Sequence, residues 1–292
     1  MARRIALIAN PAAGGGRAAR LLPGVVERLN ALGVVVRAEV TRDLAHAREL
    51  AGDAARGGEI VVTLGGDGLV GAVAGALRTE PGSVLGVLPG GRGNDFCRVT
   101  GIPLDALEAC AVVAHGVETV LDAGEAGGTT FIGIASLGFD SDANQYANTA
   151  PARLGPLVYL YGALRAMVGW KHAEFTVVVD GERTRFSGWA VAAANSGAYG
   201  GGMLMAPGAK LDDGELDVIL TQASGRAHFL RTLPKVFKGT HVEDPRVMVL
   251  RGAVVEIDAD RPFTVYADGD PIGELPITVR AVPGALRVLL PA

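Results

Sequence analysis

The segment VVTLGGDGLVGAVAGAL, residues 61–77, carries the pattern that decides the fold. An apolar run of strand type opens it, an apolar run of helical length closes it, and three glycines and Asp67 stand between them. We expect a buried strand, a tight glycine turn and a helix from about residue 69 to residue 77. Glycines at such a turn let main-chain N–H groups approach a phosphate at the helix N-terminus.

Strand and helix patterns alternate through the first 120 residues. Helical spacing runs over residues 17–32, where Pro23 should interrupt or kink the helix. A second helix is expected over residues 43–58, capped by Asp43 and closed by two glycines. Strands followed by short helices are typical of a parallel sheet that binds ligands at the carboxyl ends of its strands. The expected strands are residues 4–10, 33–40, 59–64, 83–91 and 116–124.

The second half has short strands separated by turn residues, which is typical of an antiparallel sandwich. Helices are expected at residues 157–168 and 227–237. We found no internal repeat and no low-complexity linker, so we expect two closely packed halves with a cleft between them. The expected strands are residues 129–139, 174–181, 185–195, 214–221, 253–259 and 262–269.

Composition excludes several classes of protein. The 292 residues are 49% hydrophobic and carry a net charge of −4, so the chain should fold fully and lacks the basic surface of a nucleic-acid-binding protein. No apolar stretch is long enough to span a bilayer, and the one after the N-terminal arginines is too short for a signal peptide. The two cysteines have no metal or disulfide spacing. We expect a soluble cytoplasmic protein.

The glycine turn has more than one interpretation. Residues 66–71 satisfy G-x-G-x-x-G, the dinucleotide fingerprint, but the acid expected about 20 residues later is missing. The carboxylate of Asp67 would repel a pyrophosphate unless a divalent cation lay between them. No Walker A lysine motif occurs. Dinucleotide binding, metal-assisted nucleotide binding and a turn without a ligand remain open at this point.

A second glycine loop, LPGGRGNDFCR at residues 88–98, favours the nucleotide interpretation. It follows the next strand, so both loops should emerge at one edge of the sheet. Arg92 can supply a positive charge to a phosphate. Asn94 and Asp95 either cap the following short helix or face the ligand, and we favour the second.

These loops, GGDG followed by GGRGNDFCR and GIP, resemble the diacylglycerol kinase catalytic domain family, which includes soluble bacterial lipid kinases and the sphingosine and ceramide kinases. NPAAG at residues 10–14 and NSGAYGGGMLMAPGAKLDDGELDV at residues 195–218 match further motifs, so the resemblance covers nearly the whole chain. It implies the NAD kinase-like fold, with an α/β nucleotide domain at residues 1–123, completed by residues 277–292. An antiparallel β-sandwich substrate domain would occupy residues 124–276.

The resemblance also implies ATP as cofactor. Four positions depart from the family pattern: Leu69 replaces a threonine, Ala72 replaces a glutamate, Arg92 stands where threonine is usual, and Asp270 replaces a glutamate. The implied ATP-binding residues are Asn10, Thr41, Gly65, Gly66, Asp67, Gly68, Leu69, Gly91, Arg92, Asn94 and Asp95.

Catalysis and metal binding map to two acidic turns. The base of the family corresponds to Asp270, an aspartate in place of glutamate, with Asp268 as a supporting acid; alternatively these residues form only a hairpin turn. The resemblance further implies a structural Mg²⁺ held by the carboxylate of Asp213 and the main-chain oxygens of Lys210 and Glu215. The alternatives are a solvated charged turn or a site built from other carboxylates of KLDDGELD.

The implied function is an ATP- and Mg²⁺-dependent kinase that phosphorylates the hydroxyl of diacylglycerol or a similar lipid, in phospholipid metabolism. A cytoplasmic enzyme must take such a lipid from a membrane surface, so we expect peripheral membrane contact, with the segment 159–170 as either core or a membrane-touching lip. A kinase for a sphingoid, polyprenyl or NAD-like hydroxyl and a non-catalytic nucleotide- or lipid-binding regulator are the alternatives. A homodimer stays open.

Overall fold

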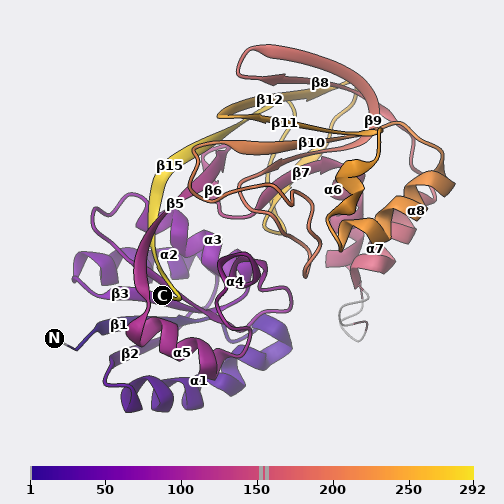
Figure 1. Cartoon of the computed structure of the whole chain (residues 1–292). Coiled ribbons are helices and arrows are strands. Elements are labelled where there is room, and N and C mark those ends of the chain that lie inside the picture. Colours follow the sequence, from indigo (N-terminus) through magenta and orange to yellow (C-terminus); the bar gives the residue numbers. More distant parts are fainter. Residues whose placement is uncertain (1, 151–153, 155–157) are drawn as a thin grey trace. The chain divides into compact units, whose positions relative to one another are not determined.

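Two compact units make up the chain (Figure 1). The structure is a computed structural model that describes residues 2–150, 154 and 158–292. Unit 1 comprises Met1–Ala123 and Gly284–Ala292, and unit 2 comprises Gly124–Pro283. This division is a structural one, and the limits of the nucleotide and substrate domains that we expect from the sequence remain a prediction.

Unit 1 is built on the predicted parallel sheet. Its strands follow the order β15-β4-β3-β1-β2, and β1, β2, β3 and β4 pair in parallel. The strands β3 and β4 are almost fully buried, since apolar side chains point to both faces of a sheet that helices cover. The strands are β1 (Arg4–Ala9), β2 (Val35–Val40), β3 (Ile60–Gly65), β4 (Leu85–Pro89) and β5 (Val117–Ala126), the last continuing into unit 2.

The helices of unit 1 connect these strands. Asp43 caps α2 as predicted, accepting a hydrogen bond of 2.7 Å from the His46 N–H. Only α5 has no counterpart in the sequence prediction. The helices are α1 (Ala13–Ala31), α2 (Leu44–Arg56), α3 (Asp67–Leu77), α4 (Asp95–Thr100) and α5 (Ala106–His115).

Two helix predictions need correction. Pro23 does not interrupt α1, whose non-helical residues are Gly14, Gly15 and Gly16, all with positive φ. The helix continues through the proline because the buried side chains of Val25 and Leu29 hold its second half. The helix α3 starts at Asp67 rather than near residue 69, because Gly66 is its N-cap.

Unit 2 is antiparallel, as predicted. Its sheet runs in the order β14-β13-β7-β9-β8-β12-β15, while β10 pairs with β9 and β11. The predicted strand at residues 129–139 is two strands, and β11 and β14 have no predicted counterpart. The strands are β6 (Thr129–Phe131), β7 (Ile134–Gly138), β8 (Ala173–Val179), β9 (Glu182–Ala194), β10 (Leu216–Gln222), β11 (Val247–Gly252), β12 (Val254–Ala259), β13 (Thr264–Ala267), β14 (Asp270–Glu274) and β15 (Ile277–Leu290).

The named helices in the described part of unit 2 are α6 (Phe139–Asn148), α7 (Val158–Met167), α8 (Arg226–Val236) and the short 3₁₀ helix η2 (Thr240–Glu243). The helices α7 and α8 match the two predicted ones, although residue 157 lies outside the described residues. An aromatic cluster holds this end of the unit, with Trp170 and Trp189 stacked at 6.1 Å and Phe139 edge-on to both. None of the helices described is long and apolar enough to cross a bilayer.

Candidate active site

Three glycine loops of unit 1 pack their main chains directly against one another. The first contains Gly14, the second Gly65 and Gly66, and the third Gly90 and Gly91. The N–H groups of Gly90 and Gly91 donate to the Gly65 carbonyl over 2.7 and 2.9 Å. A Cβ at Gly91 would lie 2.5 Å from the Gly66 Cα, and a Cβ at Gly14 would lie 2.5 Å from the Gly90 oxygen. No side chain fits at such distances, so the contact between the loops by itself requires glycine at these positions.

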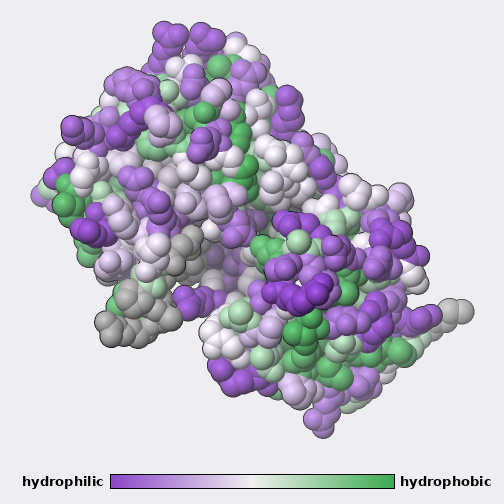
Figure 2. Space-filling model, turned by 180° about the vertical axis from the view of Figure 1, so that it is seen from behind, coloured by the Kyte–Doolittle hydropathy of each residue, from purple (hydrophilic) through white to green (hydrophobic). Residues whose placement is uncertain are grey.

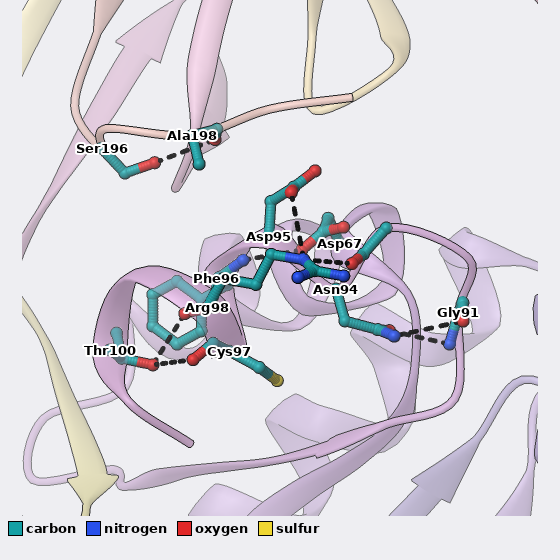
Figure 3. A network of polar contacts seen from close by, with 11 residues as sticks. Asp67, Gly91, Asn94, Asp95, Phe96, Cys97, Arg98, Thr100, Ser196 and Ala198 are labelled. Atoms are coloured by element: carbon teal, nitrogen blue, oxygen red, sulfur yellow. Dashed lines mark hydrogen bonds and ion pairs between the residues drawn. The ribbon is translucent and has the colours of Figure 1, made fainter. Parts of the chain in front are cut away.

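Asp67 connects the two predicted nucleotide loops (Figure 3). It is the first residue of α3, and its Oδ1 accepts a hydrogen bond of 3.0 Å from the Phe96 N–H in the first turn of α4. A carboxylate beside these N-terminal N–H groups is electrostatically favourable. The position of Asp67 in the turn is therefore explained by the link it makes to the second loop.

Asn94 closes the second loop on itself. Its Oδ1 accepts from the Gly91 N–H over 2.9 Å, and its Nδ2 donates to the Gly91 carbonyl over 3.1 Å. Asn94 precedes α4 with φ of 52° and makes no side-chain cap hydrogen bond. Asp95, the first residue of α4, is buried and lies 3.8 Å from the Arg98 Nε, while Arg92 is exposed (Figure 3 shows Asp95 and Arg98).

Two predicted nucleotide contacts are core side chains. Thr41 is 2% exposed and its hydroxyl donates to the Asp43 carbonyl over 2.5 Å. Leu69 is also 2% exposed, and a Cβ at Gly65 would lie 2.6 Å from its Cδ2. The structure thus gives both side chains a packing role. The sequence could not reveal this, because it does not show which way a residue in a turn faces.

The departures at Leu69 and Ala72 have a common explanation. Both side chains are buried on the core side of α3, where an apolar residue is favourable. Asn10, by contrast, stays partly exposed at the end of β1, and its Oδ1 accepts from the Ala12 N–H over 3.1 Å. The surface of the glycine loops therefore consists mainly of main chain, with Asn10, Asp67 and Arg92 as its polar side chains.

The neighbouring Cys97 is no candidate nucleophile. Burial, with the negative charge of Asp67 as a second cause, raises the pKa of the Cys97 thiol to about 12. The thiol therefore stays protonated at neutral pH, and the thiolate is the reactive form.

The two predicted catalytic acids flank Gly269 in a hairpin of unit 2, with Asp268 in its two-residue turn and Asp270 at the start of β14. Asp268 and Gly269 both have positive φ, 51° and 93°, and connect β13 to β14. The Asp268 carboxylate accepts from the N–H groups of Ile132 and Gly133, each over 2.9 Å. A Cβ at Gly133 would lie 2.2 Å from the Asp268 Oδ1, so only glycine permits this approach.

This anchoring fixes the position of Asp270. Asp270 is the first residue of β14, pairs with Ala267 of β13 and is exposed. The segment that binds Asp268 is itself held, because the Asn195 Nδ2 donates to the Ile132 carbonyl over 2.9 Å. The backbone here thus forms the hairpin turn that the sequence analysis gave as the alternative. The turn explains why Asp268 and Gly269 occur at these positions, but it does not explain why position 270 carries a carboxylate.

The predicted metal turn of unit 2 pairs with Arg251 of β11, which the sequence did not indicate. The Arg251 guanidinium pairs with Asp213, with Glu215 over 3.2 Å and with Asp217 over 2.8 Å. The other Asp213 oxygen accepts from the Glu215 N–H over 3.1 Å. Burial raises the pKa of Asp217, and Arg251 counteracts that rise.

The oxygens at this turn suit Mg²⁺, and three carboxylates around one guanidinium leave net negative charge. Within residues 2–150 and 158–292, however, no group of three potential metal-ligating side chains was found. A cation here would therefore share Asp213 with Arg251 and depend on main-chain oxygens, such as those of Lys210 and Glu215.

Comparisons with known proteins agree with this architecture. Residues 4–126 match the family model of the diacylglycerol kinase catalytic domain, and residues 133–290 match that of the YegS C-terminal NAD kinase β-sandwich-like domain. A diacylglycerol kinase of Mycobacterium tuberculosis is 35% identical over 99% of this chain and 95% of its own length. The diacylglycerol kinase of Bacillus subtilis is 26% identical over 94% of this chain and 92% of its own length.

Solved structures share the fold. One crystal structure from Bacillus anthracis aligns with a TM-score of 0.84 and 22% identity, over 99% of this chain and 95% of that one. A diacylglycerol kinase structure from the same organism aligns with a TM-score of 0.77 and 19% identity, over 99% and 97%. The order of parallel and antiparallel strands described above is therefore also found in known proteins.

Proposed function

The chain belongs to the diacylglycerol kinase catalytic domain family and is a lipid kinase, and we propose that it transfers the γ-phosphoryl group of ATP to the hydroxyl of diacylglycerol. The main support for diacylglycerol as the acceptor is the 35% identity, over 99% of the chain, to a diacylglycerol kinase of Mycobacterium tuberculosis. The aligned region covers nearly the whole chain, so it spans both units, with the glycine loops and the acidic hairpin.

ATP would bind at the glycine loops of unit 1. The first N–H groups of an α-helix have no carbonyl partner within the helix, so those of Asp67 and Gly68 at the start of α3 can donate to phosphate oxygens. Arg92 is exposed and can add a positive charge. Asp67 and Asp95 offer carboxylate oxygens of the kind that Mg²⁺ prefers, and a bound Mg²⁺ would neutralise charge on the phosphates.

Asp270 would act as the general base. Phosphoryl transfer depends mostly on positioning and charge neutralisation, and the acceptor hydroxyl must also lose its proton. An exposed carboxylate on a hairpin held at Asp268 supports this role, since the anchor limits its movement. Asp268 would be a positioning residue, because both of its oxygens already accept main-chain hydrogen bonds.

A structural Mg²⁺ at Asp213, with the main-chain oxygens of Lys210 and Glu215, remains part of the proposal. Its role would be to hold the acidic turn between residues 210 and 217 together with Arg251. Peripheral contact with a membrane also belongs to the proposal, because diacylglycerol resides in bilayers.

The test measures label transfer from γ-labelled ATP to a panel of lipids in mixed micelles. The panel holds diacylglycerol, a sphingoid base and a polyprenol, and each is given to wild type and to Asp270→Asn. We expect wild type to label diacylglycerol, and Asp270→Asn to be slower by about 10²- to 10⁴-fold, the usual contribution of a general base.

Other outcomes would overturn parts of the proposal. Label on the sphingoid base or the polyprenol instead of diacylglycerol would reject the acceptor and keep the kinase. Binding of ATP without any labelled lipid would indicate that the protein is a non-catalytic nucleotide- or lipid-binding regulator. Full activity of Asp270→Asn would remove the proposed base.

A further inference from the structure

The helix α7 exposes apolar side chains on its outer face. Tyr161 and Leu164 are 41% and 50% exposed, and Val168, directly after the helix, is 71% exposed; their spacing of three and four residues places them on one side of this segment. The opposite side, with Ala166 and Met167, is buried in the core. The core of the unit therefore gives no reason for the apolar residues on the outer side.

The helix α8 has the same arrangement. Leu230 within the helix and Phe237 just after it are 41% and 56% exposed. Phe229 and Leu233 face inward and pack against the core of unit 2. Exposed apolar residues on one helix are ordinary, whereas two helices of one unit that share the pattern call for an explanation.

The two helices lie next to each other. A hollow of about 110 Å³ is lined by Ala163 of α7, by Leu233 of α8 and Phe237 just after it, and by Phe139 and Ala143 of α6. Figure 1 shows α6, α7 and α8 at the same end of unit 2. In Figure 2, which shows one face of the molecule, hydrophobic residues occur in small groups among hydrophilic ones.

Every charged side chain of the two helices is basic. Residues 158–172 hold Arg165 and Lys171, and residues 218–242 hold four cations, with no acid in either stretch. This concentration occurs in a chain whose net charge is −4. The four cations of the second stretch are Arg226, Arg231, Lys235 and Lys238, all of them exposed.

Acids packed near this surface reduce its charge only in part. Asp244 is 9% exposed and its carboxylate lies 2.8 Å from the His228 Nε2, so it faces inward. Glu243 of η2 is exposed at the end of the basic stretch. On α6, Asp140 and Asp142 are partly buried, and burial raises the pKa of both carboxyls.

We propose that α7 and α8 form a membrane-docking surface that places unit 2 on a bilayer containing anionic phospholipids. The surface comprises Tyr161, Leu164, Arg165, Val168, Lys171, Arg226, Leu230, Arg231, Lys235, Phe237 and Lys238. Apolar side chains among lysines and arginines are the pattern of helices that lie in the membrane interface. A second copy of the chain is a poor occupant, because its own basic helices would meet these in a symmetric contact.

The inference deepens the proposed function, since the bilayer is where diacylglycerol resides, but docking itself requires neither ATP nor Asp270. The test sediments the full chain with vesicles of phosphatidylcholine, with and without phosphatidylglycerol. We expect binding to the anionic vesicles, and weakening by about fivefold for each cation removed, the usual contribution of a basic residue near an anionic surface.

Two double variants separate the contribution of charge to vesicle binding from that of apolar area, and each has a control. Arg231→Glu with Lys235→Glu removes charge, and Val168→Ser with Leu230→Ser removes apolar area; both should weaken vesicle binding. Arg183→Glu with Arg185→Glu, exposed on β9 of the same unit, and Val40→Ser, 51% exposed on β2, are matched controls that should bind as wild type.

Activity on a short-chain diacylglycerol dispersed in detergent distinguishes this inference from the proposed function. The docking variants should keep wild-type rates there while losing binding to vesicles. Equal binding to neutral and anionic vesicles, or equal binding by the charge variant and its control, would overturn the proposal. Self-association that the apolar variant abolishes, without vesicle binding by wild type, would assign the surface to a second copy instead.

Discussion

The glycine loops of unit 1 and the acidic hairpin of unit 2 are both held by a carboxylate, and they differ in what makes them rigid. Asp67 accepts one N–H from the neighbouring loop, and Asp268 accepts two from the segment at Ile132 and Gly133. Around Asp67 the main chains of three loops also touch directly, which only glycine permits. Around Asp268 the carboxylate makes two hydrogen bonds to that segment, and β13 pairs with β7 directly after it.

The difference shows how each site combines rigidity with access. A loop that is to bind phosphate through its main chain must be free of side chains, so close glycine contacts hold it without covering its surface. A hairpin that is to present one carboxylate can use a second carboxylate as its anchor. We therefore assign Asp268 to positioning and Asp270 to chemistry, whereas Asp67 links the two loops through one oxygen and can offer the other to the proposed Mg²⁺.

The largest expected effect on stability is that of Gly91→Ala. The added Cβ would lie 2.5 Å from the Gly66 Cα, and main chain cannot rotate away as a side chain does. We expect the free energy of unfolding to fall by about 3 kcal/mol, the upper end for overpacking, together with weaker ATP binding. Urea unfolding and binding of a fluorescent ATP analogue would measure both.

Gly24→Ala is the matched control for that variant. Gly24 lies within α1, and a Cβ there would meet the Leu107 side chain of α5 at 3.7 Å, an ordinary contact. If both variants unfolded at the wild-type urea concentration, close packing would not be the reason for glycine at position 91.

Asp268→Ala should have the next largest effect. It leaves the N–H groups of Ile132 and Gly133 without their acceptor, and an unsatisfied buried donor costs about 1–3 kcal/mol. Because the hairpin is partly exposed, we expect a loss of about 2 kcal/mol in the free energy of unfolding. Hydrogen exchange should then become faster at Ile132 and Gly133, and unchanged exchange there would contradict the anchoring role.

The two substitutions of Asp67, to alanine and to asparagine, should have a smaller effect on the free energy of unfolding. Asp67→Ala removes the acceptor of the Phe96 N–H and should cost about 1 kcal/mol, as for a lost helix cap. Asp67→Asn keeps an oxygen at that place and should be as stable as wild type, but with a higher Mg²⁺ requirement for activity. Equal stability of the two variants would show that the link between the loops contributes nothing.

The smallest effect is expected for Arg251→Gln, at the acidic turn with the proposed metal. Its ion pairs are partly exposed, so we expect a loss of less than about 1 kcal/mol at neutral pH. The proposed Mg²⁺ should raise the melting temperature of this variant more than that of wild type, because it would replace the missing positive charge. Calorimetry with Mg²⁺ and with EDTA would show this difference or its absence.

Much of the fold could be predicted because its signals are local. The alternation of β-branched runs and amphipathic helices gave the parallel sheet of unit 1, and Asp43 marked the start of α2. The family prediction, based on two glycine loops and the later motifs, is confirmed by the matching family models. The sequence prediction lacks α6 because its first residue, Phe139, was included in the strand expected at residues 129–139, although Phe139, Ala143 and Tyr146 have helical spacing.

The predicted site was less complete because its residues are fixed by contacts between distant segments. Arg251 lies 34 residues from Asp217, and Gly133 lies 135 residues from Asp268. Nor does a motif show that Thr41 and Leu69 point into the core. β14 was missed because Asp270 and Pro271 have the composition of a turn.

The central claim, that Asp268 positions and Asp270 reacts, is tested most directly by measuring the rate of diacylglycerol phosphorylation and the melting temperature for Asp270→Asn. The account predicts a rate lower by about 10²- to 10⁴-fold with an unchanged melting temperature. A wild-type rate, or a lower rate fully explained by a lower melting temperature, would contradict it.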